Sequence, residues 1–318
     1  MTAPALLLAY DGSPAAESAV RAAGALFPRA RAAVVTVQRE PATFQQSAGL
    51  ARVAIPDEVI AGGLAALARA AGREAAATAA EGARSATAAG IAAEARTVDA
   101  AGSPWRGIRR AAAETGAEVI VCGSRGLGAL SRSTLGSTSS GLLHYAGRTV
   151  LVVPGGETDL SGGMVIGYDG SAPARAAIAR AGRLLAGREA IVVNVWESTI
   201  RRSLSGRALT ATPFDELTAL VGDLDEYFAA VSAEVAAEGA ELAREHGLEA
   251  RPEAVEAAGS AWHGLLAAAQ ASAAAVVVVG SRGRGGLASS LLGSTSSGLV
   301  HNADLPVLVV PSSGAEDP

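Results

Sequence analysis

The sequence predicts an α/β protein made of two tandem, doubly wound, parallel five-stranded sheets, each with the expected strand order 3-2-1-4-5. An internal repeat gives the two units, because Tyr10-Asp11-Gly12-Ser13 recurs as Tyr168-Asp169-Gly170-Ser171. Within each unit, short β-branched runs alternate with alanine-rich stretches of helical composition, the pattern of βαβ units. The runs Val-Ile-Val-Cys at 119–122 and Val-Val-Val-Val at 276–279 lack polar alternation. Such runs are typical of central strands that helices cover on both faces.

Five strands are expected in each repeat, each a short run rich in apolar and β-branched residues. In the first repeat they are Ala5–Tyr10, Ala33–Gln38, Ile91–Val98, Glu118–Cys122 and Thr149–Val153. In the second repeat they are Met164–Tyr168, Ala190–Trp196, Leu248–Val255, Ala275–Val279 and Pro306–Val310. The closing strands present bare apolar edges, which favour pairing of the two halves about a pseudo-two-fold axis.

The same repeat places the domain boundaries. Gly102-Ser103-Pro104-Trp105 recurs as Gly259-Ser260-Ala261-Trp262, so the duplication covers a whole domain. Between the copies lies a polar, glycine-flanked segment that is typical of a flexible linker. The expected units are a first domain at 1–154, a linker at 155–163, a second domain at 164–311 and a tail at 312–318.

Composition excludes several classes of function. The chain has 318 residues, a formal net charge of −5 and an isoelectric point near 5.5, which disfavours a nucleic-acid surface. All 26 basic residues are arginine, so a lysine of the kind found in phosphate-binding P-loops is ruled out. The single Cys122 and four scattered histidines predict neither a disulfide nor a metal site. With no leader-like start at Met1–Ala9 and no uninterrupted apolar span, a cytoplasmic protein without membrane contact is expected.

A glycine-spaced loop appears near the end of each repeat and indicates phosphate binding. Gly123, Gly126 and Gly136-Ser137 are separated by two and nine residues, and Gly280, Gly283 and Gly293-Ser294 repeat that spacing. Glycines allow backbone N–H groups to approach an anion. The Ser-Thr-Ser run that follows is expected to cap a helix whose N-terminus favours negative charge. A pair of plain turns would not require the nine-residue gap.

Three segments of each repeat should converge at one ligand site. In an open parallel sheet, ligands bind beyond the carboxyl ends of the strands, where the strand order reverses. Asp11, Val37 and the Gly123 loop follow the first, second and fourth strands, and Asp169, Val195 and the Gly280 loop repeat this arrangement. A carboxylate there can accept hydrogen bonds from ribose hydroxyls, an extended backbone can pair with an adenine edge, and the loop can hold the phosphates.

With these motifs, the chain resembles a tandem universal stress protein, of the subgroup whose glycine motif binds ATP. The resemblance rests on the Asp after the first strand, on Gly-x2-Gly-x9-Gly-Ser, and on Val-Leu-Val-Val-Pro at 150–154 and 307–311. It implies a Rossmann-like, adenine nucleotide alpha hydrolase-like fold, ATP with or without Mg²⁺ as cofactor, and a homodimer of tandem chains. The candidate binding residues of the first repeat are Asp11, Gly12, Val37, Gly123, Ser124, Arg125, Gly126, Gly136, Ser137 and Thr138. Those of the second are Asp169, Gly170, Val195, Gly280, Ser281, Arg282, Gly283, Gly293, Ser294 and Thr295.

The role of the arginines inside the first glycine pair stays open at this stage. Arg125 and Arg282 could contact phosphate or could hold the loop through a salt bridge. Members of the family commonly carry charged residues after the Gly-Ser motif, whereas Ser139-Ser140-Gly141 and Ser296-Ser297-Gly298 stand here. Arg284 replaces Leu127, which predicts a second site that is more electropositive than the first.

The motifs favour a nucleotide-dependent regulatory or stress-response module with little or no turnover. They supply a cradle for phosphate but not the positioned nucleophile and the charge neutralisation that phosphoryl transfer needs. No catalytic residue is therefore assigned, and the regulatory protein partner is not indicated. Two alternatives remain: a slow ATPase or adenylating enzyme, and an interaction scaffold that carries no nucleotide.

Overall fold

The computed structural model describes residues 3–38, 57–126, 135–198, 214–257, 259–283 and 292–312. The first half contains β1 (Ala5–Ala9), α1 (Pro14–Leu26), β2 (Arg31–Gln38), α3 (Asp57–Ala88), β3 (Ala92–Asp99), α4 (Pro104–Glu114), β4 (Val119–Gly123), α5 (Ser137–Tyr145) and β5 (Thr149–Val153). The second half contains β6 (Met164–Gly167), α6 (Ala172–Leu184), β7 (Glu189–Trp196), α8 (Phe214–Glu245), β8 (Glu249–Glu256), α9 (Ala261–Ala271), β9 (Val276–Gly280), α10 (Ser294–Asn302) and β10 (Val307–Val310). The expected strands are thus all confirmed, with ends that shift by one or two residues.

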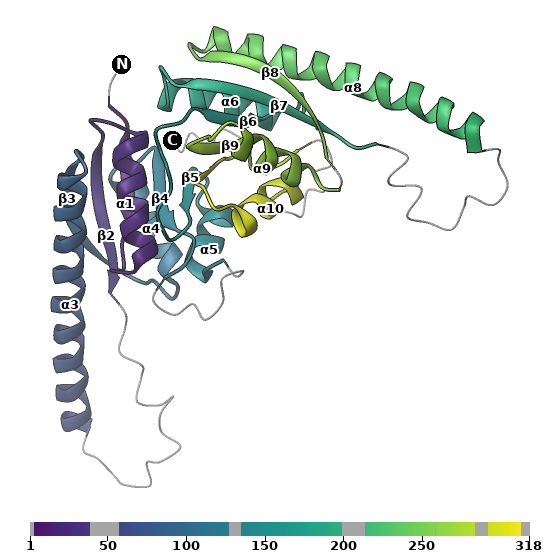
Figure 1. Ribbon diagram of the computed structural model, residues 1–318. Coiled ribbons are helices and arrows are strands. Elements are labelled where there is room, and N and C mark those ends of the chain that lie inside the picture. The colour runs from purple at the N-terminus through teal and green to yellow at the C-terminus, as the bar shows by residue number, and fades with distance from the viewer. Residues whose placement is uncertain are drawn as a thin grey trace.

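The described strands form one ten-stranded sheet in the order β3-β2-β1-β4-β5-β10-β9-β6-β7-β8 (Figure 1). Within each half the pairs are parallel, and the order is the predicted 3-2-1-4-5. The two halves meet where β5 and β10 pair in antiparallel register, with Leu151 opposite Leu308. The predicted pairing of the closing strands is therefore confirmed, and it makes one continuous sheet from the two repeats.

Helices cover both faces of this sheet, so its central strands are apolar on both sides. Buried residues of α1, α3, α6 and α8 join one core cluster, and those of α4, α5, α9 and α10 join the other. Along β1, Leu6 and Leu8 belong to the first cluster and Leu7 to the second, and all three are almost completely buried. This is the burial that an apolar run without polar alternation predicts.

The start of α1 shows how local sequence sets the position of a helix. Ser13 is its N-cap, its side-chain oxygen accepts a hydrogen bond from the Ala16 N–H at 3.2 Å, and Pro14 follows. Proline suits the first helical position because it needs no N–H partner there. Ser171 caps α6 in the same way by accepting from the Ala174 N–H at 3.3 Å.

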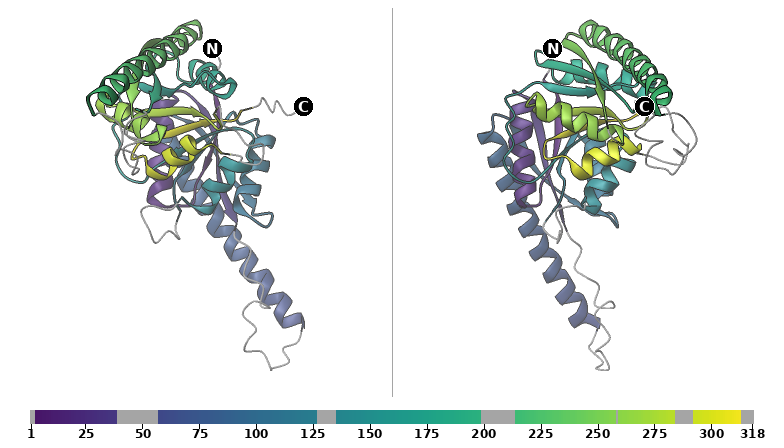
Figure 2. Two further views of the ribbon diagram at one scale, coloured as in Figure 1. Left: turned by 90° about the vertical axis from the view of Figure 1, so that its right-hand side faces the viewer. Right: turned by 45° about the vertical axis from the view of Figure 1, so that its right-hand side comes forward.

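The long helices α3 and α8 are packed on the sheet at one end and project beyond it at the other (Figures 1 and 2). Each lies close to the sheet because a glycine faces a tyrosine ring. A Cβ on Gly82 would lie 2.6 Å from Tyr10, and a Cβ on Gly239 would lie 2.5 Å from Tyr168. Among the described helices, none is both long enough and apolar enough to cross a membrane.

The interface between the halves also includes charged groups that reach from one repeat to the other. Arg180 on α6 donates to the Thr149 hydroxyl at 3.1 Å and to the Glu118 carbonyl at 3.0 Å. Arg183 forms an ion pair with the Glu118 carboxylate. Burial lowers the pKa of Arg180, but an arginine remains charged at any physiological pH. These contacts are made by the second repeat alone, because alanine stands in the first repeat where Arg180 stands in the second.

Candidate nucleotide site at the strand ends

In the second half, the predicted site residues surround a cavity at the carboxyl ends of β6, β7 and β9. The cavity has a volume of 450 Å³, within the usual range for small-molecule sites. Of the predicted residues, the following line it: Asp169, Val195, Gly280, Arg282, Gly283, Gly293, Ser294 and Thr295. Gly170 and Ser281 do not line it but lie next to residues that do.

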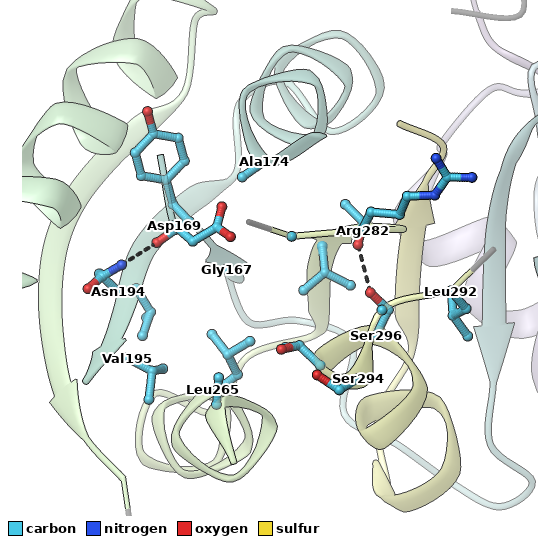
Figure 3. A pocket seen from close by; sticks show the side chains of 18 residues that line it. Gly167, Asp169, Ala174, Asn194, Val195, Leu265, Arg282, Leu292, Ser294 and Ser296 are labelled. Carbon is cyan, nitrogen blue, oxygen red and sulfur yellow. Dashed lines mark hydrogen bonds between the residues drawn. The ribbon is translucent and has the colours of Figure 1, made fainter. Parts of the chain in front are cut away.

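The cavity has an apolar end and a polar end. Figure 3 shows Val195 and Leu265 together at one end and Ser294 at the other, with the Asp169 carboxylate above them. The polar end is formed by backbone of the glycine loop and by the start of α10. Such a division suits a ligand that carries a flat apolar group on one side and an anion on the other.

The three glycine positions of each loop differ in whether, and why, the structure requires glycine there. Gly123 and Gly280 end central strands, and an added Cβ would lie 2.8 Å from the backbone of Ala15 or Pro173. These two glycines are therefore required by packing of α1 and α6 against the sheet.

Gly126 and Gly283 lie against the aspartates that follow the first strand of each half. An added Cβ would lie 2.4 Å from Asp11 Oδ2 at Gly126 and 3.0 Å from Asp169 Oδ2 at Gly283. The two motifs thus meet at each site, as the topology predicts.

Gly136 and Gly293 are different, because no described residue demands glycine there. Both have negative φ, at −65° and −72°, in the extended region that any residue adopts. An added Cβ would make only ordinary contacts, the nearest at 3.4 Å in each case. Among the described residues, an added side chain at either position would therefore have room, as would a bound anion.

The loops are closed by backbone hydrogen bonds at Ser124 and Ser281. The Ser124 carbonyl accepts from the Gly136 N–H at 2.8 Å, and the Ser281 carbonyl accepts from the Gly293 N–H at 2.7 Å. The N–H of each serine is also used, donating to Val153 or Val310 of the closing strand. The N–H groups of Gly136 and Gly293 are therefore used within the protein and are not donors for a ligand.

The helices α5 and α10 begin directly after these glycines, and the expected serine cap is wrong. Gly136 and Gly293 are the N-caps, without a side-chain cap bond, and the Ser-Thr-Ser run forms the first turn. Ser139 instead donates to the Gly123 carbonyl, and Ser296 donates to the Gly280 carbonyl, both at 2.7 Å. These serines therefore connect the start of each helix to the end of the preceding strand. The first N–H groups of each helix have no partner within the helix and can donate to a ligand.

The glycines at the end of the Ser-Thr-Ser-Ser-Gly run accommodate the two tryptophans. A Cβ on Gly141 would lie 2.3 Å from Trp105 Cδ1, and a Cβ on Gly298 would lie 2.1 Å from Trp262 Cδ1. Both tryptophans are packed against the core, and Trp262 is not among the residues that line the cavity of the second half. The residues that depart from the family's common pattern thus have a packing role.

We expect Gly298→Ala to destabilise the protein by about 1–3 kcal/mol, because the added methyl group forces α10 away from Trp262. Gly62→Ala is the control, since Gly62 is an exposed residue of α3 with open space around its Cα. Alanine should stabilise that helix by about 0.5–1 kcal/mol. Denaturant unfolding measures both changes, and equal effects at the two glycines would contradict the packing role of Gly298.

Each site aspartate is held by the turn that follows it. Asp11 Oδ1 accepts from the Ser13 N–H, and Asp169 Oδ1 accepts from the Ser171 N–H, both at 3.0 Å. Gly12 and Gly170 have φ of +76° and +78°, a conformation that favours glycine. These two glycines therefore shape the turn that aims each carboxylate at the site.

The two arginines inside the first glycine pair form no ion pair with the described residues. The Nε of Arg282 is buried and has no hydrogen-bond partner in the described part of the chain. Figure 3 shows its guanidinium directed away from Val195 and Leu265. Arg284 and Leu127, which predict a difference in charge between the sites, lie outside the described residues.

Two buried tyrosines stand behind the sites and carry raised pKa values. Tyr168 donates to Glu238 at 2.8 Å, and burial, then this hydrogen bond, raises its pKa to about 12. Burial and a hydrogen bond to Glu17 also raise the pKa of Tyr10. In the first half Cys122 takes the place of Val279, and burial raises the pKa of its thiol to about 12, which makes it an inert core residue.

We expect the stability contributed by Tyr168 to be present below pH 10 and to be lost as the pH rises towards 12. Its pKa is 10.0 in the unfolded chain and about 12 in the fold, so the folded state favours the protonated phenol. Alkaline titration followed by phenolate absorbance should show late steps for Tyr10 and Tyr168, and Tyr168→Phe should remove the one near pH 12. A titration in which Tyr168→Phe removes a step near pH 10 would contradict the raised value.

Sequence reasoning missed several residues that line the cavity: Ala174, Asn194, Leu265, Leu292 and Ser296. Two of them carried a signal. Asn194 is a polar residue inside an apolar strand, and it is satisfied by donating to the Tyr168 carbonyl and accepting from Ser232. Leu292 precedes Gly293 as Leu135 precedes Gly136, so the repeated motif is one residue longer than the glycine spacing indicates.

Comparison with known proteins identifies the family. The family model of universal stress proteins matches residues 4–154 and 163–311. The chain belongs to the universal stress protein family. A universal stress protein from Mycolicibacterium smegmatis is 36% identical over 203 residues, which are 62% of this chain and 63% of that protein. Universal stress protein Rv2005c from Mycobacterium tuberculosis is 34% identical over 200 residues, 61% of each chain. These alignments span less than two thirds of the relatives' own length.

Solved structures of universal stress proteins share the fold. One from Archaeoglobus fulgidus has a TM-score of 0.60 at 21% identity, covering 98% of this chain and 100% of that one. A second, described as a putative universal stress protein from Pseudomonas aeruginosa, has a TM-score of 0.54 at 15% identity, covering 98% and 94%. The adenine nucleotide alpha hydrolase-like fold, with two 3-2-1-4-5 halves, is thereby established for this universal stress protein.

Proposed function

We propose that this universal stress protein binds ATP at the strand ends of both halves and acts as a nucleotide-dependent regulatory module. The observation that carries the proposal is the glycine at 136 and 293, which neither backbone conformation nor packing against the described residues requires. Each of these glycines stands at the start of a helix, where N–H groups and the helix dipole favour an anion.

The division of the second cavity supports a particular orientation of the nucleotide. The adenine would lie at the apolar end beside Val195 and Leu265, and the phosphates would lie at the first turn of α10. The N–H groups of that turn and the hydroxyls of Ser294 and Thr295 are the proposed donors. Several such charge-assisted hydrogen bonds, at about 1.5–3 kcal/mol each, are enough for micromolar affinity.

The position of Asp169 favours the ribose rather than the phosphates as its contact. A carboxylate near a triphosphate would repel it, whereas a carboxylate can accept from the two ribose hydroxyls. The turn at Gly170 holds this carboxylate toward the middle of the cavity, between the apolar and polar ends. Asp11 is held by an identical turn and is proposed for the same role in the first half.

The charges around the second cavity favour binding over turnover. Among the described residues that line it, Arg282 is the only basic one, and its guanidinium is directed away from the apolar end. A phosphoryl transferase needs cationic groups that neutralise charge in the transition state. We therefore propose slow hydrolysis at most, and a signalling role that depends on whether ATP occupies the sites.

Calorimetric titration with ATP, with and without Mg²⁺, tests the proposal, and ADP and AMP release in the same samples tests turnover. Two bound ATP per chain with product release much slower than dissociation is the expected result. Rapid ADP release would favour an ATPase, and AMP with pyrophosphate would favour adenylation. If the chain binds no adenine nucleotide, the proposal is wrong and the result favours an interaction scaffold.

A further inference from the structure

The projecting part of α8 carries an exposed apolar stripe. Leu224, Tyr227, Phe228 and Val231 follow the spacing i, i+3, i+4, i+7, so they share one face of the helix. Their side chains are 40%, 63%, 38% and 37% exposed. A stripe of this kind on a helix in water is typical of an interaction surface.

The fold does not require this stripe, because the first repeat lacks it. Gly82 and Gly239 face equivalent tyrosines, so α3 and α8 correspond with an offset of 157 residues. At that offset the stripe residues of α8 match four residues of α3: Leu67, Ala70, Ala71 and Glu74. Only the first of these positions keeps a large apolar residue, so the stripe belongs to the second repeat alone.

The α8 surface is also strongly acidic. Residues 214–243 contain no arginine, and the acids Asp223 and Glu234 are exposed beside the stripe. No ion pair within the described part of the chain includes either of these acids. Two α8 helices placed face to face would bring like charges together, which disfavours symmetric pairing of the stripe with itself.

A surface of opposite charge lies on α4 and α5 of the first repeat. Arg106 lies over the ring of Trp105 at 5.2 Å, and Trp105 stacks on Tyr145 with ring centroids 4.9 Å apart. Tyr145 is 50% exposed, and Arg106 and Arg109 are exposed and belong to no ion pair of the described residues. We call Trp105, Arg106, Arg109 and Tyr145 the α4/α5 patch.

This patch is likewise absent from the other repeat. The residues that match Arg106, Arg109 and Tyr145 in the second half are His263, Leu266 and Asn302. Within one chain, α8 and α4/α5 cover opposite faces of the sheet, so both surfaces are available to a second chain. Each repeat thus carries one surface that the other lacks, and the two surfaces are complementary in charge and both include aromatic side chains.

We propose that two copies of the chain associate by docking α8 of each on the α4/α5 patch of the other. Such a dimer is closed by a two-fold axis, because each copy donates one surface of each kind. Acidic residues beside the stripe would face Arg106 and Arg109, and Tyr227 and Phe228 would pack on Trp105 and Tyr145. The association does not depend on the nucleotide sites, and salt weakens it because exposed charges contribute.

Sedimentation velocity over a range of protein concentrations, without nucleotide, tests this assignment. The variants replace residues of one repeat by those at the matching positions of the other repeat. Tyr227→Ala with Phe228→Ala and Val231→Glu gives α8 the residues of α3. Arg106→His with Arg109→Leu gives α4 the residues of α9. Each variant should raise the dimer dissociation constant at least about tenfold while keeping the wild-type circular dichroism spectrum.

Charge reversal separates direct docking from an indirect effect. Arg106→Glu with Arg109→Glu, and Asp223→Arg with Glu234→Arg, should each dissociate the dimer, and the chain carrying all four changes should associate again. A monomeric wild type, which would assign the α8 stripe to a different protein, overturns the proposal. The proposal is also overturned if only the α8 variants lose the dimer, or if the chain with all four charge reversals stays monomeric.

Discussion

Replacing Gly293 by glutamate is expected to remove ATP binding from the second site and to leave the fold intact. The backbone at Gly293 is extended, with φ −72° and ψ 160°, so glutamate is conformationally allowed. Its carboxylate would stand where the phosphates are proposed to lie, adding repulsion to the loss of space. We expect the affinity of that site to fall at least about 100-fold, which is roughly 2.7 kcal/mol.

Calorimetry should then report one bound ATP per chain instead of two, and Gly136→Glu should remove the other site. Gly62→Glu adds the same charge on an exposed part of α3 and is the matched control. Gly293→Ala should lower the ATP affinity less than Gly293→Glu does, because its methyl group carries no charge and makes only ordinary contacts with the described residues. Unchanged ATP binding in both glutamate variants would contradict the site assignment.

Leu308→Ala is expected to destabilise the protein by about 2–5 kcal/mol, the cost of a cavity in a well-packed core. Leu308 and its partner Leu151 are completely buried where β10 meets β5. Because the sheet is continuous across this pair, the change should shift the unfolding of both halves together. Denaturant unfolding, followed by far-ultraviolet circular dichroism, measures the shift.

Leu67→Ala is the control for this experiment, since Leu67 is 57% exposed on α3. A surface change of this kind costs within about 0.5 kcal/mol. Two separate transitions, of which only one responds to Leu308→Ala, would contradict a cooperative core shared by the halves.

The fold could be predicted from the sequence because the residue patterns that determine it are local and occur in both repeats. Val119–Cys122 and Val276–Val279 are apolar on both faces, which places them at the centre of a parallel sheet. The apolar edges of the closing strands predicted the join between the halves. Strand ends shifted by a residue or two because hydrogen bonding, rather than composition, decides where a strand stops.

Most residues predicted for the second site line one cavity, but the sequence did not give the division of their structural roles. Spacing cannot distinguish Gly123, which packing against Ala15 requires, from Gly136, which no contact with the described residues requires. It also could not show that Ser139 reaches back to the Gly123 carbonyl instead of capping the helix. These roles depend on distances between segments far apart in the chain, which one sequence does not contain.

A crystal structure of the protein grown with ATP is the most direct test of the central claim. The account predicts a triphosphate at the first turns of α5 and α10, next to Gly136 and Gly293, with adenine beside Val37 and Val195. Density for ATP at a different place, or strand ends that bind no nucleotide while ATP is in excess, would contradict it.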